Sequence, residues 1–433
     1  MRSWVKHLKT ELEQAWSLED GPGEPAAGPY AGLVNAGMRF ALDSPAPALV
    51  RSELEYLAWN YCVVASRLHP RLASVYVPAD FDEETVGFVQ AQTQAWWLDR
   101  RARAMAADVL LPFMSLTDVN GILGRGHMLV LTSDLTRRLV RAASLAAGSQ
   151  GSAGVPEPLE AGAAAARTLA RAEEPAATAA GPPATRPHSR GWSRSRRDSG
   201  RRLLDIGAGD GAATSRVLAA LDVRPDDVVA TEASAPMVRA LAARGFEAIE
   251  TTRLDEGPLA EPGQFDVVLA LNVLDRTDDP AALLGDVRRH LAPGGVAVVA
   301  VVLPFRPMVE DGATKRDPAV PLRLPRAAAT PGVAFEDSAT MLLAHAIHPA
   351  VSARGGITDG WPRAHPLCLL TLRPAHPALL PSQGLEPVAF TSVPYLCEGD
   401  GRATLFALRD AVFVLRACEP VAPPGVGVPA VPE

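Results

Sequence analysis

The chain has few of the residues that build disulfide or metal sites. Its 433 residues include four cysteines, and no two of them form a C-x-x-C pair. This pattern argues against a disulfide framework or a zinc site and favours a reducing compartment. His345 and His348 form an H-x-x-H pair, but no acidic or cysteine partner stands at a suitable spacing. We therefore expect no bound metal.

Long apolar runs and a strong excess of one charge are also missing. No stretch approaches the roughly 18 apolar residues that a membrane-spanning helix needs. Residues 1–16 alternate charged and apolar types and lack the continuous apolar core of a secretory signal. The formal net charge is -7, which does not indicate nucleic-acid binding. We expect a monomeric, cytoplasmic protein that neither spans a membrane nor binds nucleic acid.

Composition divides the chain into a helical N-terminal region, a low-complexity insert, an α/β domain and a loose tail. These four parts are residues 1–141, 142–200, 201–419 and 420–433. The first part has apolar residues at helical spacing over 52–68 and 83–111. The second is rich in Ala, Gly, Pro and Ser and cannot bury enough apolar surface to offset its ordering entropy. We therefore expect the insert to be disordered.

The α/β domain alternates strands and helices. Strands are expected at 202–206, 227–231, 246–250, 265–270 and 296–303, and helices near 211–221, 235–244 and 279–292. This alternation predicts a Rossmann-like, doubly wound parallel sheet. Further strands at 387–393 and 411–416, with a loop at 394–400 between them, would complete seven strands. Residues 312–383 form an irregular insert whose helix-like part is 335–348.

The most informative motif is LLDIGAGDG, residues 203–211, because a second apolar run follows it and ends at Glu232. A strand, a glycine-rich turn and a helix are typical of a nucleotide-cofactor site at the carboxyl edge of a parallel sheet. Gly207, Gly209 and Gly211 would let the backbone approach a ligand, and Glu232 would accept hydrogen bonds from two ribose hydroxyls. The Gly-x-Gly-x-Gly spacing suits S-adenosylmethionine, which has no pyrophosphate to seat on the helix. The fold is therefore expected to be a methyltransferase sheet with an N-terminal helical extension.

Four polar residues lie in this motif or follow the fourth expected strand. Asp205 would hold the turn or meet the methionine amino group of the cofactor, and Asp210 would cap the following helix. Asn272 and Asp275 follow the fourth expected strand, where methyl acceptors meet the cofactor in such folds. We expect Asp275 to be the catalytic carboxylate. The alternative is that it pairs with Arg276 or caps the next helix.

Seven blocks of the chain resemble the DREV family of methyltransferases, the protein-histidine N-pros methyltransferases. They are NGILGRGH (120–127), LLDIGAGDG (203–211), ATEASAPM (230–237), LNVLDR (271–276), VLPFRPMVE (302–310), PYLCEGD (394–400) and DAVFVL (410–415). The first, fourth and sixth are not general methyltransferase features, so their occurrence in this order is specific. The resemblance implies methyl transfer from S-adenosylmethionine to the δ1 nitrogen of histidine in proteins with His-x-His sequences. It also allows an association with endomembranes.

The resemblance assigns roles to individual residues. Asn272 resembles a position near the cofactor and the acceptor, and Tyr395 resembles a residue that contacts the cofactor or the substrate. The acidic pair Glu398 and Asp400 would suit a partly cationic, histidine-rich peptide, although a solvated loop is the alternative. Tyr395, Glu398 and Asp400 are expected in a loop near the end of the sheet that could close over the site.

Two further residues have an expected role in binding. Arg125, in a lid over the methionine end of the cofactor, would face the cofactor carboxylate, or else form a surface salt bridge. Phe305 would line the peptide groove, or else pack in the core. Both positions lie in blocks that carry the family resemblance.

Histidine chemistry explains why a carboxylate is expected in the site. The unperturbed pKa of histidine is about 6.5, so most of the side chain is already neutral at pH 7. A strong base is therefore not required, but the δ1 nitrogen must present its lone pair while ε2 carries the proton. A carboxylate that accepts the ε2 N–H would fix this tautomer and stabilise the cation formed on methylation.

Two other functions remain open at this point. The first is methylation of a small molecule, since the glycine motif alone does not exclude it. The second is a cofactor-binding scaffold without activity, which the irregular composition of residues 312–383 favours.

Overall fold

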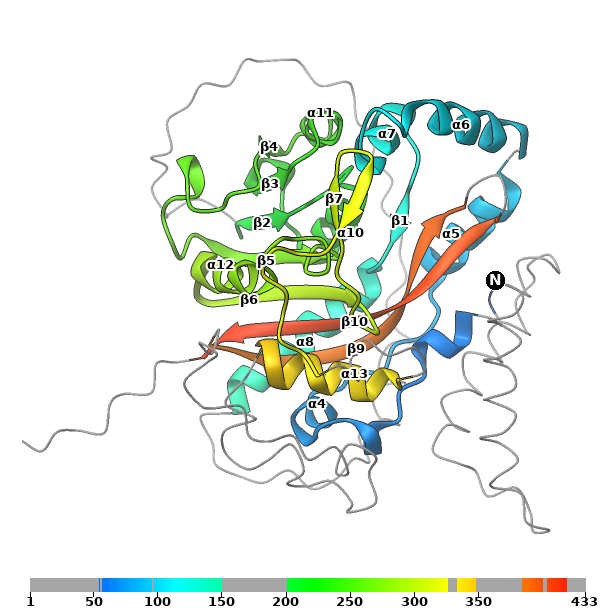
Figure 1. Cartoon of the computed structure of the whole chain (residues 1–433). Coiled ribbons are helices and arrows are strands. Elements are labelled where there is room, and N and C mark those ends of the chain that lie inside the picture. Colours follow the sequence, from blue (N-terminus) through cyan, green and yellow to red (C-terminus); the bar gives the residue numbers. More distant parts are fainter. Residues whose placement is uncertain are drawn as a thin grey trace, which may run out of the picture.

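Apolar runs and helix-forming segments alternate from residue 201 onward, and they fold into a mixed sheet flanked by helices (Figure 1). The computed structural model describes residues 54, 57–95, 97–149, 201–325, 333–347, 384–399 and 403–418. The sheet has eight strands in the order β1-β9-β10-β6-β5-β2-β3-β4. A separate two-stranded sheet pairs β7 with β8.

The parallel half of the sheet confirms the predicted alternation. Its strands are β2 (Leu203–Ile206), β3 (Val228–Glu232), β4 (Glu247–Glu250), β5 (Phe265–Leu271) and β6 (Leu291–Val302). The helices between them are α10 (Ala212–Leu221), α11 (Ala235–Ala243) and α12 (Pro280–His290). Helices are needed here because parallel neighbours require crossover connections. The carboxyl ends of β2, β3 and β5 therefore meet at one edge of the sheet.

The strand β6 begins earlier than predicted. It pairs with β5 from Leu291 onward, and the register shifts between Phe265 and Val267. A Cβ on Gly295 would lie 3.0 Å from the carbonyl oxygen of Phe265. The glycine-rich segment is therefore a bulge within the strand, and it needs a residue without a side chain at this close approach.

Two long antiparallel strands close the sheet. β9 (Leu385–Glu398) pairs with β10 (Leu405–Ala417), and β10 also pairs with β6. Both predicted strands are confirmed, but the predicted loop at 394–400 is wrong over 394–398. Leu396 is buried in the core and pairs with Ala407, so apolar packing extends the hairpin beyond the parallel strands.

The N-terminal region forms a helical arm. It contains α4 (Pro70–Ser74), α5 (Glu83–Gln94), α6 (Trp97–Leu110), α7 (Leu116–Leu123) and α8 (Ser133–Ser149). The predicted helix at 83–111 is therefore two helices, since Ala95 adopts an extended conformation with a ψ of 134°. Between α7 and α8, β1 (Met128–Leu129) pairs with β9. This short strand raises the predicted count of seven strands to eight.

The helix predicted at 52–68 is wrong over its described second half. This segment forms two 3-10 turns, η1 (Trp59–Tyr61) and η2 (Ala65–Arg67). The backbone N–H of Val64 donates to Oε1 of Glu336 at 2.8 Å. Tertiary contacts with a distant helix therefore override the local helical pattern.

The structure also corrects both predicted inserts. Residues 142–149 belong to α8, whose Leu139 and Ala143 are buried, so the prediction of disorder is wrong there. Residues 150–200 lie outside the described part, as do 348–383, 420–433 and 1–53. In the second insert, β8 (Thr314–Arg316) pairs with β7 (Val309–Asp311). The predicted helix there is confirmed as α13 (Phe335–Leu342), which continues into the π-helical turn η6 (Leu343–Ile347).

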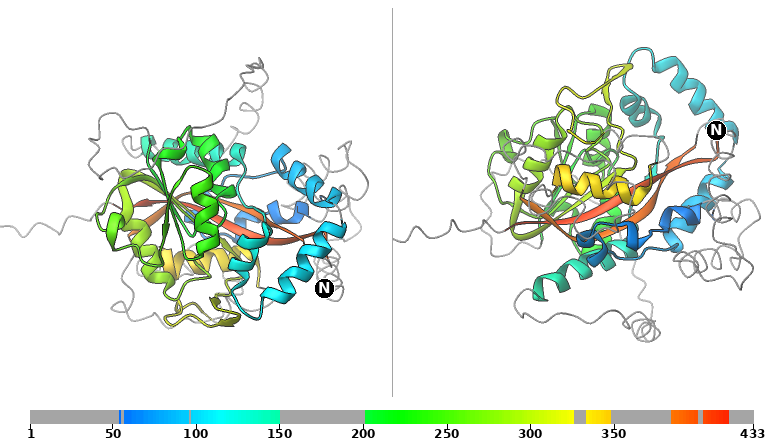
Figure 2. Two further views of the ribbon diagram at one scale, coloured as in Figure 1. Left: turned by 90° about the horizontal axis from the view of Figure 1, so that it is seen from above. Right: turned by 60° about the horizontal axis from the view of Figure 1, so that its bottom comes forward.

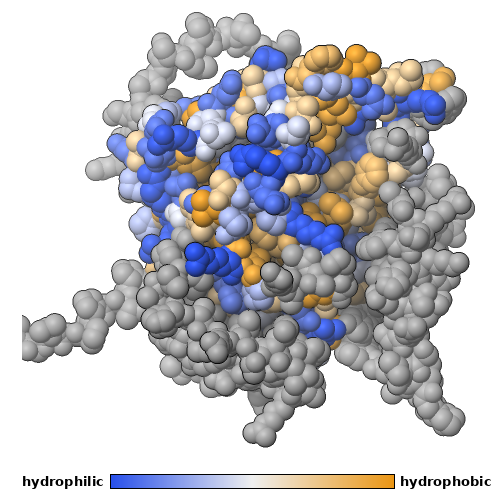
Figure 3. All heavy atoms as spheres, viewed as in Figure 1, coloured by the Kyte–Doolittle hydropathy of each residue, from blue (hydrophilic) through white to orange (hydrophobic). Residues whose placement is uncertain are grey.

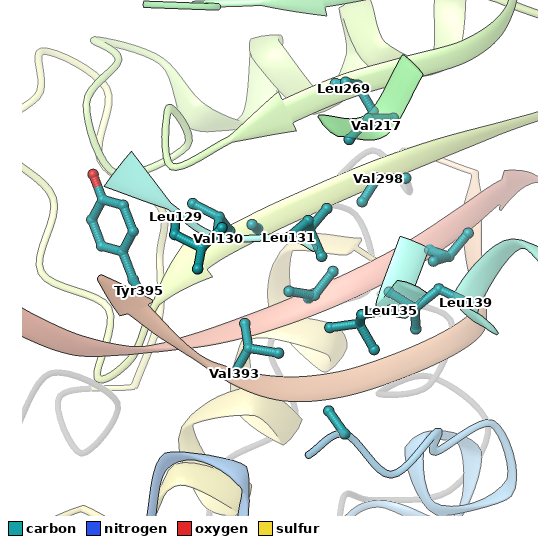
Figure 4. Packing of buried hydrophobic residues seen from close by; sticks show 14 of the residues in the cluster. Leu129, Val130, Leu131, Leu135, Leu139, Val217, Leu269, Val298, Val393 and Tyr395 are labelled. Carbon is teal, nitrogen blue, oxygen red and sulfur yellow. The ribbon is translucent and has the colours of Figure 1, made fainter. Parts of the chain in front are cut away.

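The arm is anchored in the core against β9. Figure 4 shows Leu129, Val130 and Leu131 packed near Val393 of β9 and Leu135 of α8. All five side chains are buried. Each buried Leu or Val contributes roughly 1.5–3 kcal/mol relative to exposure. The segment that precedes α8 is therefore held rigidly against the sheet.

The arm then reaches over the parallel half of the sheet. In Figure 2, left, the segment with α7 lies beside the parallel half of the sheet, seen from above. The surface of the arm is apolar in places, as the orange atoms at the top of Figure 3 show, and Val109 and Phe113 are 68% and 81% exposed. No helix in the described residues is long and apolar enough to cross a membrane.

Candidate active site

The glycine turn, residues 207–211, connects β2 to α10. Gly207, Gly209 and Gly211 have φ values of +67°, +59° and +75°, a region that side chains disfavour. A Cβ on Gly209 would meet no atom within 4 Å, so there is space above the middle of the turn. Glu232, at the end of β3, accepts the N–H of Gly209 on Oε2 at 2.9 Å. The predicted carboxylate therefore stands directly at the turn.

The environment of Glu232 fits a ribose ligand. Its Oε1 accepts the N–H groups of Ala233 and Ser234 at 2.8 and 3.2 Å. These bonds hold the carboxylate at the end of β3, where two ribose hydroxyls could share its oxygens. The open space at Gly209 and the fixed carboxylate together suit the nucleoside part of S-adenosylmethionine.

Asp205 holds the turn from below. Its side chain is 2% exposed and accepts a hydrogen bond from the hydroxyl of Thr214 on α10. Burial raises the pKa of this carboxyl to about 7, although the Thr214 bond opposes the shift. Two roles were predicted for Asp205, holding the turn and binding the methionine amino group. The bond to Thr214 favours the first. Asp210 accepts the N–H of Ala212 at 2.9 Å, but the N-cap of α10 is Gly211, which has no side-chain cap, so the predicted N-cap role of Asp210 is wrong by one residue.

The predicted lid, residues 120–127, begins within α7, which lies against the end of β3. Asp118 on α7 accepts the hydroxyl of Ser234 at 2.7 Å. A Cβ on Gly121 would lie 2.8 Å from Cβ of Pro236, so α7 and α11 approach closely. Oδ1 of Asn120 is buried without a hydrogen-bond partner among the described residues. This oxygen is a further acceptor beside the cofactor edge.

Two residues with predicted ligand contacts, Arg125 and Glu398, lie in or beside the lid. Nη1 of Arg125 lies 3.5 Å from the carbonyl oxygen of Arg103 on α6. Oε2 of Glu398 accepts the N–H of Gly126 at 2.8 Å and that of His127 at 3.3 Å. Its Oε1 lies 3.7 Å from Arg103. Glu398 therefore tethers the lid in place of the predicted contact with a peptide. That Arg125 faces the cofactor carboxylate stays a prediction.

His127 connects the lid to the glycine turn. Its Nδ1 lies 3.3 Å from Oδ2 of Asp210. The hydrogen bond to Asp210 raises the pKa of His127, against the opposing effect of desolvation. Asp210 also lies 3.6 Å from Arg244, and these partners outweigh burial and lower the pKa of Asp210.

The segment after β5 touches the glycine turn. A Cβ on Gly207 would lie 2.3 Å from Cγ1 of Val273, so the turn must pass this segment without a side chain. Asn272 has a φ of +57°, and its N–H donates to the carbonyl of Ala300 at 2.9 Å. A non-glycine residue in this conformation is uncommon and often occurs at functional sites.

Asn272 is held by a carboxyl group that the sequence motifs did not assign. Its Nδ2 donates to Oδ2 of Asp410 on β10 at 2.7 Å. Asp410 is fully buried, and burial together with the charge of Asp275 raises the pKa of Asp410 to about 8. The one feature of the sequence that could have identified Asp410 is its position as a carboxylate at the start of the apolar run DAVFVL.

Asp275 stands next to this pair. Its side chain is buried, and Oδ2 lies 3.5 Å from Nε of Arg276. Burial raises the pKa of Asp275, while Arg276 lowers it. We call Asn272, Asp275 and Asp410 the acceptor cluster, because each keeps Oδ1 buried without a partner among the described residues.

The remaining predicted residues lie elsewhere. Phe305 is 3% exposed within the core, so its predicted place in a peptide groove is wrong. Tyr395 lies on β9 rather than in a loop, and its hydroxyl bonds Sδ of Met128. Burial raises the pKa of Tyr395, and the nearby Asp410 adds to the shift, which places Tyr395 beside the acceptor cluster. Asp400 lies outside the described residues.

His345 belongs to the buried turn η6, and burial lowers its pKa. Its H-x-x-H partner, His348, is outside the described residues. Among the residues that the structure describes, no three His, Cys, Asp or Glu side chains gather as a metal site would require.

The fold and the glycine turn together define a class of protein. A doubly wound sheet with this turn, and a carboxylate at the end of the next strand, defines the S-adenosylmethionine-dependent methyltransferases. The chain belongs to the DREV methyltransferase family, which it matches over residues 59–163 and 189–352, more than half of its length. S-adenosylmethionine is the cofactor of this family.

Individual relatives match a shorter part of the chain. The ubiquinone biosynthesis O-methyltransferase of Ruegeria pomeroyi is 34% identical over 105 residues, which are 24% of this chain and 42% of that protein. Fumosorinone synthetase of Cordyceps fumosorosea is 36% identical over 107 residues, which are 23% of this chain and 3% of that protein. The chain thus spans less than half the length of these relatives.

One solved structure with similarity to this chain is a methyltransferase of Thermotoga maritima, a possible histamine N-methyltransferase. It is 27% identical, covers 24% of this chain and 45% of that one, and has a TM-score of 0.20.

Proposed function

We propose that this protein transfers a methyl group from S-adenosylmethionine to the δ1 nitrogen of histidine in His-x-His sequences of other proteins. The family membership supports the methyltransferase part of the proposal. The motif blocks at 120–127, 271–276 and 394–400, which resemble the histidine-specific enzymes, support the choice of substrate. The observation that carries the proposal is the acceptor cluster beside the glycine turn.

The chemistry of the cluster favours nitrogen as the methyl acceptor. Asn272, Asp275 and Asp410 each keep a buried oxygen without a partner among the described residues, and those of Asn272 and Asp275 can accept a hydrogen bond. A buried acceptor without a partner is unfavourable by about 1–3 kcal/mol, so the site is suited to a ligand that brings N–H groups. Methylation of a neutral imidazole produces a cation, and a carboxylate stabilises such a charge where it develops.

Asp275 would orient the target imidazole and stabilise the charge that forms on it. The bound cofactor supplies an electrophilic methyl group on a sulfonium ion. Asp275 accepts the ε2 N–H of the target imidazole and so leaves the lone pair on δ1. Burial raises the pKa of Asp410 to about 8, whereas Asp275 has Arg276 beside it at 3.5 Å, so we assign the negative charge of the pair to Asp275. It stabilises the methylated imidazolium until the ε2 proton leaves to solvent.

Methylation of a small molecule is the second candidate. The ubiquinone biosynthesis O-methyltransferase relative, which matches 24% of this chain, supports it. A phenol acceptor would need a base to remove its proton, and Asp275 beside Arg276 is the available group. The inactive scaffold is disfavoured by the unpartnered oxygens of the acceptor cluster, because a protein that only binds the cofactor has no use for them.

Methylation of synthetic peptides tests the proposal. The protein is incubated with S-adenosylmethionine and a peptide that contains Ala-His-Ala-His, and fragmentation mass spectrometry distinguishes δ1- from ε2-methylhistidine. We expect δ1 methylation. Two histidines separated by one residue point the same way in an extended peptide, so one can enter the site while the other binds beside it.

A matched peptide with a bulky residue between the two histidines is the control, and we expect much slower turnover on it. A product methylated only at ε2, or equal rates on a peptide with one isolated histidine, would contradict the specificity. Methylation of a phenol without methylation of any histidine peptide would favour the small-molecule function.

A further inference from the structure

Asp410 is a buried carboxyl group that the proposed chemistry does not itself use. It lies on β10 opposite Val302 of β6 and Val393 of β9, and its side chain is fully buried. An apolar residue would pack in this position without the unfavourable desolvation of a carboxyl. The presence of Asp410 therefore calls for a function, and its single hydrogen-bonding partner among the described side chains is Asn272.

The amide of Asn272 has two ends with opposite chemistry. Its Nδ2 can only donate hydrogen bonds, and its Oδ1 can only accept them. Oδ2 of Asp410 accepts from Nδ2 at 2.7 Å, which leaves Oδ1 as the end without a partner. A rotation of the amide by half a turn would break this bond and present the donor end instead.

We propose that Asp410 is a positioning residue that fixes the amide of Asn272 with its carbonyl oxygen toward the bound methyl donor. The following residue, Val273, lies against Gly207 of the glycine turn, so Asn272 stands at the edge of the cofactor site. The geometry needs no charge on Asp410, because Oδ2 accepts a hydrogen bond whether Oδ1 is protonated or not.

The surroundings of Asp410 keep this arrangement neutral overall. Burial and the charge of Asp275 raise the pKa of Asp410 to about 8, and the Asn272 bond opposes the shift. Tyr395 and Cys397 of β9 are its other titratable neighbours, and burial raises the pKa of both. Arg276 is the cation that acts on these two groups. Asp410 can therefore hold Asn272 without placing a second negative charge beside Asp275.

The inference uses only the cofactor class, so its test does not require the histidine substrate. Sinefungin is an analogue of S-adenosylmethionine that carries an amine in place of the methyl sulfonium group, whereas S-adenosylhomocysteine has no group there. A carbonyl oxygen aimed at this position would bind the amine and leave S-adenosylhomocysteine unaffected. The ratio of the two affinities therefore reports the orientation of the Asn272 amide.

Isothermal titration of the full chain with both ligands forms the experiment. We expect the Asp410→Ala and Asn272→Ala variants to bind sinefungin about 10-fold more weakly, with affinity for S-adenosylhomocysteine changed less than about threefold. The double variant should lose no more than Asn272→Ala alone, because Asp410 acts through Asn272. Asp410→Asn, which keeps an acceptor oxygen, should recover part of the loss.

Val414→Ala is the matched control on the same strand. Val414 is fully buried in β10, so its truncation creates a comparable packing defect away from Asn272. It should lower the melting temperature and leave the affinity ratio unchanged. If Asp410→Ala does not fold, the comparison uses Asp410→Asn and Asn272→Ala, because neither variant shortens a side chain of β10.

Two results would overturn the inference. The first is an unchanged affinity ratio in both the Asp410→Ala and the Asp410→Asn variants. The second is an additive loss in the double variant. A wild-type protein that shows the expected ratios but methylates no histidine peptide would contradict the proposed function and leave the role of Asp410 standing.

Discussion

The glycine turn and the acceptor cluster lie at the same edge of the sheet, yet the chain assembles them differently. The turn comes from one stretch of sequence, and Glu232 reaches it from the next strand through a bond to the N–H of Gly209. The cluster joins Asn272 to Asp410, which is 138 residues further along the chain. The first site depends on backbone geometry, and the second depends on side chains brought together by the sheet.

This difference has a functional consequence. Backbone N–H groups and a carboxylate fixed at the end of a strand suit a cofactor that never changes. A cluster of side chains from separate strands can vary without disturbing the cofactor turn, so it suits the chemistry of the methyl acceptor. The two sites should therefore respond differently to mutation. The turn should control the affinity for S-adenosylhomocysteine, and the cluster should control turnover.

Removal of Glu232 should have the largest effect on binding. The Glu232→Ala variant loses the charged acceptor for the ribose hydroxyls, and each such bond contributes about 1.5–3 kcal/mol. We expect cofactor binding to fall below detection in a calorimetric titration while the fold is retained. Glu250→Ala is the matched control, because Glu250 ends the neighbouring strand β4 and is exposed. An affinity change of less than about threefold in Glu232→Ala would refute the ribose assignment.

Asp275→Asn should lower turnover and leave cofactor affinity unchanged. The amide fills the same space but can donate to ε2 and so favour the wrong tautomer of the target histidine. We expect turnover to fall at least about 100-fold, within the range for lost acid–base groups, with cofactor affinity unchanged. Asp278→Asn is the control, since Asp278 is an exposed partner of Arg316. Retained turnover in Asp275→Asn would remove it from the catalytic role.

The tether between His127 and Asp210 should have the smallest effect, and it should depend on pH. The raised pKa of His127 means that its contribution to stability is full below its unfolded pKa and is lost as the pH rises through the folded value. Asp210 has a lowered pKa, so the stability that this ion pair contributes is lost again when the pH falls through the pKa of Asp210. His127→Gln should therefore reduce the free energy of unfolding more at pH 6 than at pH 8.

The size of this effect is limited by solvent. The side chain of His127 is 49% exposed, so we expect a difference of about 0.5 kcal/mol or less between the two pH values. Denaturant unfolding of both proteins at each pH measures it. A larger loss at pH 8 than at pH 6 would show that the ion pair is not the source of the stability.

The same contrast explains what could be predicted from the sequence. The glycine turn, Glu232 and the parallel strands were predictable because local spacing determines them. The bond between Asn272 and Asp410 was not, since it depends on the register of β10 against β6. Glu398 was misassigned for a related reason. Its position near the end of the sheet was foreseeable, but its use by the N–H groups of Gly126 and His127 requires the folded arm.

A crystal structure of the protein with S-adenosylhomocysteine and an Ala-His-Ala-His peptide tests the division between the two sites most directly. We expect the ribose hydroxyls within hydrogen-bonding distance of Glu232, and the ε2 N–H of one histidine on Asp275 with its δ1 nitrogen toward the cofactor sulfur. A ribose bound away from Glu232, or a histidine whose ε2 nitrogen faces the sulfur, would contradict the account.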